Sequence, residues 1–85
     1  MNIVVLTPDK EVFNGEIKSV KVPGVGGGFQ ILRGHAPLVS ALGEGVVSIE
    51  KTDGQKMTFG INQGFVEVLR NEISLLVTGL SLIHI

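Results

Sequence analysis

The residues that could do chemistry in this 85-residue chain are concentrated in one stretch, Val22–Leu42, with the sequence VPGVGGGFQILRGHAPLVSAL. It combines a glycine cluster, Gly24–Gly28, with a single histidine, His35, in a Gly-His-Ala-Pro segment. A glycine-rich loop can bind phosphate through its backbone N–H groups, and a histidine can act as a general base. Both kinds of chemistry depend on the residues around them.

The residues around this stretch suit neither phosphate binding nor base catalysis. A phosphate-binding loop opens a helix and is often followed by lysine, whereas this loop leads into a strand-like run, Phe29–Ile31. A catalytic histidine needs a nucleophile and an orienting acid, and no nearby Ser, Asp or Glu is suitably spaced. The scattered acids are typical of solvated faces and turn ends, namely Glu11, Glu16, Glu44, Glu50, Glu67 and Glu72. We therefore predict no catalytic, cofactor-binding or metal-binding residues, and no cofactor.

Two interpretations of the stretch stay open on composition alone. In the first, Gly24–Gly28 is a wide, flexible hairpin, and His35 is satisfied by backbone groups in a loop that Pro37 closes. In the second, the stretch is a contact surface. Glycine lets another chain come close, and Phe29 and Arg33 are residue types enriched at protein interfaces.

Length and composition narrow the class of protein. A chain of 85 residues forms one small domain, and 44% hydrophobic residues without cysteine indicate a core that holds without disulfides. A net charge of −1 gives no field to attract nucleic acid, and no apolar run reaches the roughly 18 residues that would predict membrane insertion. The start MNIVVLTPDK lacks the features of a secretory or import signal, so we expect a bacterial-type cytoplasmic location.

The elements that must position the stretch are predicted to be strands. Apolar residues recur at every second position in short runs, such as GVVSIEK and KMTFGI, and Asp53-Gly54 between these two runs predicts a hairpin. Ile17 is out of phase with Val20 and Val22, which indicates a bulge or strong twist. FVEVLR is apolar on both faces, and Asn71 predicts a turn before EISLLV. The pattern predicts an all-β, antiparallel sandwich or barrel without a helix.

Three segments in order carry a resemblance to a known family. TPDKEVFNGEIKSVKVPG, GGFQILRGHAPLVSALGEGVV and INQGFVEVLRNEISLLV follow one another in register, and Gly34–Leu38 lies ten residues after Gly24. From Met1 to about Thr78 the chain resembles the N-terminal β-sandwich domain of the epsilon subunit of the F-type ATP synthase.

The resemblance implies a small antiparallel β-sandwich of two sheets with about ten short strands. It divides the chain into an epsilon-type domain, residues 1–78, and an apolar tail, residues 79–85. It implies a non-catalytic central-stalk subunit that links the gamma subunit to the membrane c-ring and so couples proton or sodium flow to ATP synthesis. Such a subunit is peripheral, at the cytoplasmic face of the bacterial inner membrane. The alternative is a generic β-sandwich module that binds a protein or another ligand.

The resemblance also assigns interface residues. The ring-facing loop would comprise Gly27, Gly28, Phe29, Gln30 and Arg33, and the gamma-facing residues would be His35, Ala36, Pro37, Leu38 and Leu42. We expect Leu38, Val39 and Leu42 to include residues buried against the core or gamma. The family commonly has an acid at the position of Gly28, glycine at that of Gln30 and proline at that of Arg33, so a ring contact through that acid is in doubt here.

The end of the chain departs from the family. Members normally continue into a helical hairpin that can inhibit ATP hydrolysis and sometimes binds ATP, whereas this chain ends at Ile85. We therefore expect no self-inhibition and no nucleotide binding of that kind. The tail GLSLIHI is either a last strand or a non-native extension, and His84 is not expected to bind metal because too few ligands accompany it.

Overall fold

The computed structural model describes residues 1–82, which form nine strands and no helix. The all-β prediction is confirmed, and the number of strands is close to the expected ten. The strands are β1 (Asn2–Leu6), β2 (Glu11–Val22), β3 (Phe29–Leu32), β4 (Leu38–Leu42), β5 (Gly45–Lys51), β6 (Lys56–Ile61), β7 (Gln63–Leu69), β8 (Glu72–Thr78) and β9 (Ser81–Leu82). His84, which is predicted not to bind metal, lies outside the described residues. In the described part of the chain, no helix is long and apolar enough to cross a membrane.

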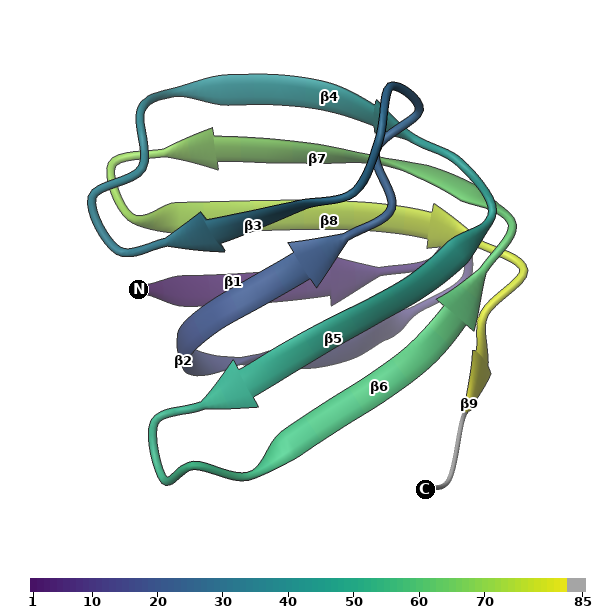
Figure 1. Ribbon diagram of the computed structural model, residues 1–85. Coiled ribbons are helices and arrows are strands. Elements are labelled where there is room, and N and C mark those ends of the chain that lie inside the picture. The colour runs from purple at the N-terminus through teal and green to yellow at the C-terminus, as the bar shows by residue number, and fades with distance from the viewer. Residues whose placement is uncertain (83–85) are drawn as a thin grey trace.

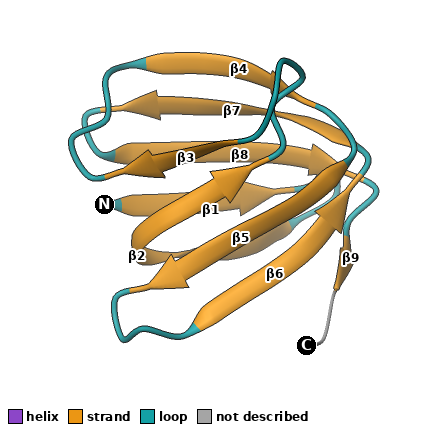
Figure 2. Ribbon diagram, in the orientation of Figure 1, coloured by secondary structure: helices purple, strands orange, loops and turns teal. Residues whose placement is uncertain are grey.

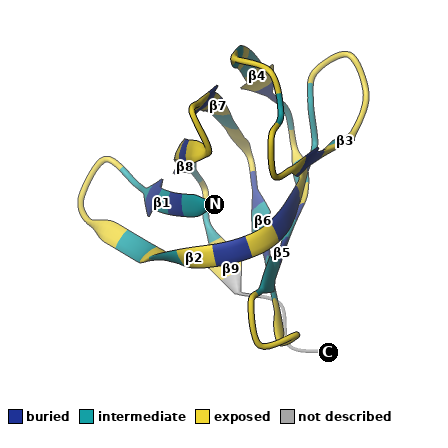
Figure 3. Ribbon diagram, turned by 90° about the vertical axis from the view of Figure 1, so that its left-hand side faces the viewer, coloured by how far each residue is buried: buried dark blue, intermediate teal, exposed yellow. Residues whose placement is uncertain are grey.

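The strands form one curled sheet whose two halves pack face to face as the layers of a sandwich (Figures 1 and 2). Along the sheet the order is β4-β7-β8-β1-β2-β5-β6-β9, and β3 pairs with β2 beside this path. We call β4-β7-β8-β1 the first layer and β3-β5-β6-β9 the second layer. β2 belongs to both, because it bends from one layer into the other (Figure 3).

The expectation of an antiparallel sandwich holds for every strand pair described except one. β1 pairs antiparallel with β2 but parallel with β8, where Ile3 lies opposite Ile73 and Val5 opposite Leu75. A parallel pair requires a long connection between its strands. Here almost the whole domain separates β1 from β8 along the chain. A local sequence pattern therefore cannot predict this pairing.

β2 carries the bulge that its side-chain pattern predicts. Ile17 pairs with Lys51 and Ser19 with Glu50, so Lys18 is an extra residue without a partner on β5. A bulge shifts the alternation of side chains by one position. As a result Ile17 and Val20 both point into the core although they are three residues apart. The strand begins at Glu11 and passes through Asn14-Gly15 without a turn.

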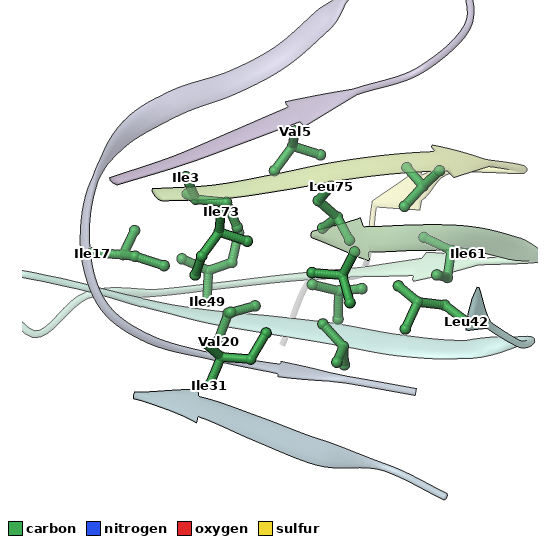
Figure 4. Close-up of a cluster of buried hydrophobic side chains, with 14 of the residues drawn as sticks. Ile3, Val5, Ile17, Val20, Ile31, Leu42, Ile49, Ile61, Ile73 and Leu75 are labelled. Carbon is green, nitrogen blue, oxygen red and sulfur yellow. The ribbon is translucent and has the colours of Figure 1, made fainter. Parts of the chain in front are cut away.

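The core lies between the layers and is built almost wholly from valine, isoleucine and leucine side chains (Figure 4). The only buried aromatic side chain among the described residues is Phe59. Residues 47, 49, 59 and 61 alternate along β5 and β6, as predicted for two strands joined at Asp53-Gly54. Close packing of β-branched side chains on two pleated surfaces gives a stiff sandwich.

Asn71 connects three parts of the fold at one end of the sandwich. Arg70 and Asn71 form the β7–β8 turn with φ of 52° and 62°, as a two-residue hairpin turn of type I′ requires. The Asn71 carbonyl oxygen accepts a hydrogen bond from the Asn2 N–H at 3.0 Å, which fixes the start of β1. Its side-chain Oδ1 accepts a second one from the Gly34 N–H at 2.7 Å, which fixes the β3–β4 connection.

Substitution of Asn71 is expected to separate the contribution of its backbone from that of its side chain. Asn71→Ala removes the hydrogen bond to Gly34. It also places alanine at a positive φ, where its Cβ is strained and its side chain cannot form a local hydrogen bond. We therefore expect a loss of about 1–3 kcal/mol in the free energy of unfolding. Asn71→Gly keeps the turn and loses only the side-chain bond, so its loss should be smaller. Urea unfolding of both variants measures this difference. Equal stability of Asn71→Ala and the wild type would contradict the role of this residue.

Candidate functional site

The stretch singled out from the sequence forms two connections at opposite ends of β3. We call Pro23–Gly28 the glycine loop and Leu32–Pro37 the histidine turn. The glycine loop precedes Phe29, and the histidine turn begins at the last residue of β3 (Figure 1). At about 3.3 Å per residue along a strand, the two lie roughly 10–15 Å apart.

The base of the glycine loop is held to the end of β4. The Val25 N–H donates to the Ala41 carbonyl at 3.1 Å, and the Gly43 N–H donates to the Pro23 carbonyl at 2.8 Å. Gly24 pairs with Leu42 as an isolated bridge between these two bonds. The hairpin is therefore anchored at its base, and only its tip, residues 26–28, projects freely from the described part of the protein.

The glycines of the loop have different physical reasons to be glycine. A Cβ on Gly24 would lie 2.6 Å from the Gly27 carbonyl oxygen and 2.8 Å from the Phe29 ring, so the packing of Phe29 excludes a side chain there. Gly27 has a φ of 128°, which only glycine adopts without strain. At Gly26 a Cβ would meet nothing within 4 Å, and at Gly28 it would make one ordinary contact of 3.5 Å. The fold itself therefore gives no reason for glycine at these last two positions.

An open hollow of about 600 Å³ lies beside the glycine loop. Its ionisable side chains are Lys21 and Glu44, and the rest of its wall is backbone, Pro23, Phe29, Gln30 and aliphatic carbon. One lysine and one carboxylate on an open surface are not an acid–base pair poised for catalysis. The hollow can instead accommodate side chains of another protein.

The histidine turn is a tight turn that is held in place by a hydrogen bond to Asn71 in the β7–β8 turn. The His35 N–H donates to the Leu32 carbonyl at 3.1 Å, and Gly34 has a φ of 82°, which is the value required at the third position of a type II turn. Proline is favoured at the second position of such a turn, and this chain has Arg33 there. The turn forms nevertheless, because Gly34 supplies the positive φ and its N–H donates a hydrogen bond to the side chain of Asn71.

His35 is half-buried, and its Nδ1 lies 2.7 Å from the carbonyl oxygen of Ala36. This contact to backbone is what the first interpretation of the histidine expected. No Asp, Glu or Ser is hydrogen-bonded to the ring in the described structure, and residues 1–82 contain no group of three metal-ligating side chains. The ring has the surroundings of a structural or interface residue.

The other predicted interface residues differ in how far they can reach a partner. Gly27, Gly28 and Gln30 are exposed, whereas Phe29 and Leu38 are half-buried. Arg33 is also exposed, but it lies in the histidine turn with the exposed Ala36 and Pro37, at the opposite end of β3 from the glycine loop. Leu42 has only 2% of its surface exposed and lies in the core. Its side chain therefore packs inside the domain and cannot contact gamma directly, while its neighbour Val39 is 70% exposed.

Sequence reasoning missed Asn71 as a component of the site. The sequence predicts a turn at Asn71. Gly34 and Asn71 are 37 positions apart, so no local pattern predicts the hydrogen bond between them. An asparagine at the second position of a two-residue turn offers a side-chain acceptor, and that is the only local signal.

Comparison with known proteins identifies the family. The profile described as "ATP synthase, Delta/Epsilon chain, beta-sandwich domain" matches residues 1–81. An ATP synthase epsilon chain of Helicobacter pylori (strain HPAG1) is 43% identical over 79 residues, which are 93% of this chain and 63% of the relative. That of Chlorobaculum tepidum is 49% identical over 72 residues, which are 85% of this chain and 82% of the relative. The chain thus spans less than two thirds of the Helicobacter protein and most of the Chlorobaculum protein.

Solved structures show the same fold at lower identity. A chain in the Euglena gracilis mitochondrial ATP synthase structure "OSCP/F1/c-ring" has a TM-score of 0.87 at 20% identity and covers 94% of this chain and 51% of its own length. A chain in the Tetrahymena thermophila mitochondrial ATP synthase "central stalk/cring" has a TM-score of 0.80 at 19% identity, over 94% of this chain and 64% of its own. The resemblance that the sequence motifs indicated is confirmed, and the chain belongs to the family of ATP synthase delta and epsilon chains, of which it forms the β-sandwich domain.

Proposed function

We propose that the domain is a non-catalytic part of the central stalk of an F-type ATP synthase, where it links the gamma subunit to the c-ring. Rotation of the ring, driven by proton or sodium flow, would pass through the domain to gamma and so to ATP synthesis. The domain would lie peripherally at the cytoplasmic face of a bacterial inner membrane. Family membership supports this role, as does the Tetrahymena neighbour, which comes from a structure of a central stalk and c-ring.

The observation that carries the proposal is the contrast between the two ends of β3. At one end, Gly26 and Gly28 expose backbone where the fold does not require glycine. Bare backbone lets another chain approach closely, as the contact with polar loops of a ring demands. At the other end, the histidine turn presents a fixed edge, since Gly34 is bonded to Asn71. A domain with separate contact surfaces at its two ends is suited to join two partners.

The construction between these ends suits the transmission of torque. β3 and β4 are tied to each other through the base of the glycine loop, and each is hydrogen-bonded to a neighbouring strand, β2 and β7 respectively. Hydrogen-bonded strands over a close-packed core resist deformation. Force applied at the glycine loop therefore reaches the histidine turn through strands rather than through a flexible linker.

The site supports binding better than catalysis. His35 contacts a backbone carbonyl, and the hollow beside the glycine loop offers one lysine and one carboxylate. A generic binding module for glycans is less well supported, because sugar platforms use exposed Trp and Tyr and the chain has neither.

Substitution at Gly26 tests the ring-facing surface. We expect Gly26→Gln to change the free energy of unfolding by less than about 0.5 kcal/mol, because its side chain projects into open space. We expect the same variant to weaken binding to the gamma–ring assembly of Chlorobaculum tepidum by about tenfold, since a side chain now separates the backbones. Thr52→Gln, in the exposed β5–β6 turn, is the matched control. Unchanged ring binding by Gly26→Gln would contradict the assignment of this loop.

Gly24→Ala is the complementary variant. Its Cβ would collide with the Gly27 carbonyl and the Phe29 ring, so we expect a loss of about 1–3 kcal/mol in the free energy of unfolding. Urea unfolding of Gly24→Ala and Gly26→Ala measures the contrast. Similar stability of the two variants would mean that the close contacts at Gly24 do not constrain the loop.

The histidine turn is tested by co-purification with the isolated gamma subunit. We expect the wild-type chain to bind gamma, and we expect scrambling of residues 34–38 to abolish binding while circular dichroism still shows a folded sheet. His35→Ala should weaken binding by roughly threefold to tenfold, because it removes one half-buried interface side chain. A scrambled β5–β6 turn, residues 52–55, is the control. Undiminished gamma binding by both variants would place the gamma contact elsewhere.

A further inference from the structure

The chain contains one Asn-Gly pair, Asn14-Gly15, and it lies where such a pair is not expected. Asn-Gly is a preferred dipeptide of two-residue hairpin turns, and both residue types are depleted in strands. Here the pair lies inside β2, in the half of the strand that pairs with β1. The pair therefore serves no turn, and its presence in the strand needs another physical reason.

Packing of Phe13 explains the glycine. A Cβ on Gly15 would lie 3.1 Å from Cζ of the Phe13 ring, which is closer than ordinary van der Waals contact. The ring is half-buried against the core, and the ammonium group of Lys51 lies 5.4 Å from its centroid. Phe13 thus occupies the space that a side chain at position 15 would need. The fold favours glycine directly after Asn14.

The side chain of Asn14 is exposed, and its amide group is held only loosely. Its Nδ2 donates to Glu11 Oε1 at 3.5 Å, and its Oδ1 accepts a hydrogen bond from Asn2 Nδ2 at 3.4 Å. Both distances are long for hydrogen bonds. These contacts do little to keep the amide carbon, Cγ, from reacting with the backbone that follows it.

An asparagine followed by glycine can lose ammonia without an enzyme. The backbone nitrogen of Gly15 attacks Cγ of Asn14 and gives up its proton, and the side-chain NH2 group leaves with a proton as ammonia. The new C–N bond closes a five-membered succinimide. Water then adds to one of the two succinimide carbonyl carbons and cleaves its C–N bond, which yields aspartate or isoaspartate. Glycine favours the attack because it has no side chain to hinder it.

Pairing with β1 opposes this reaction in the folded chain. The Ile17 N–H donates to the Met1 carbonyl at 2.8 Å, and hydrogen-bonded pairs recur at every second position of an antiparallel ladder. Gly15 and Ile3 lie opposite each other and are the next such pair. The extended backbone therefore directs the Gly15 nitrogen toward β1 and away from Cγ of Asn14. The buried side chain of Ile3 holds β1 in this place (Figure 4).

We propose that Asn14-Gly15 is a site of spontaneous deamidation whose rate is set by how often β2 separates from β1. Paired strands protect the site, and each separation allows the succinimide to form. Both products weaken the pairing afterwards. Aspartate places a second carboxylate beside Glu11, and isoaspartate lengthens the backbone of β2 by one carbon, which disturbs its register with β1. This inference is independent of the central-stalk role, because it depends only on the Asn-Gly pair and the strand opposite.

The full chain with Asp53→Asn tests the proposal, because it carries the same dipeptide a second time in the exposed β5–β6 turn. Asparagine keeps the Oδ1 acceptor that position 53 offers to the Gln55 N–H. Peptide mass spectrometry in mildly alkaline buffer follows the exchange of NH2 for OH at both positions, in the folded protein and in concentrated urea. The rate in urea divided by the rate in the folded protein measures the protection of each position. We expect position 14 to be protected at least about tenfold more strongly than position 53.

Ile3→Val in the same background loosens β1 without changing either Asn-Gly pair. The substitution removes one buried methylene group, so we expect the rate at position 14 to rise by about twofold to tenfold while the rate at position 53 stays the same. Equal protection of the two positions would overturn the control by β1, as would a rate at position 14 that does not respond to Ile3→Val. Absence of deamidation at position 14 in urea would overturn the site itself.

Discussion

The structure depends on one strand, β2, which must serve two layers at once. Its first half pairs with β1 and its second half with β3 and β5, so the strand has to bend while both halves keep apolar side chains inside. The bulge at Lys18 meets this requirement, because one extra residue brings Ile17 and Val20 to the same side. Without the bulge, one half of β2 would turn its core residues outward.

The position of the proposed contact surfaces follows from this bend. Once β2 has entered the second layer, it delivers the glycine loop at its end, and β3 then returns along β2 to the histidine turn. The bonds from the loop base to β4 and from Gly34 to Asn71 tie both connections to the first layer. The two connections are therefore separated by the length of β3. They are held through the pairing of β3 with β2 and through their hydrogen bonds to the first layer. That separation is what a coupling between two partners needs, and the stiffness of the sheet keeps it constant.

Much of the fold could be predicted from the sequence because its signals are local. The Asp53-Gly54 hairpin, the alternation in β5 and β6 and the phase shift at Ile17 each depend on a few adjacent residues, and all are present in the structure. The features that escaped prediction depend on residues far apart in the chain. The parallel pairing of β1 with β8 and the hydrogen bond from Gly34 to Asn71 arise only when distant strands meet.

Site-specific cross-linking in the assembled complex tests the central claim most directly, namely that the two ends of β3 face different subunits. The chain has no cysteine, so Gly26→Cys and Ala36→Cys each introduce a single reactive thiol at an exposed position. With a short bifunctional reagent, the account predicts that the thiol at position 26 links to a c subunit and the thiol at position 36 links to gamma. Linkage of both thiols to the same subunit, or the reverse assignment, would contradict it.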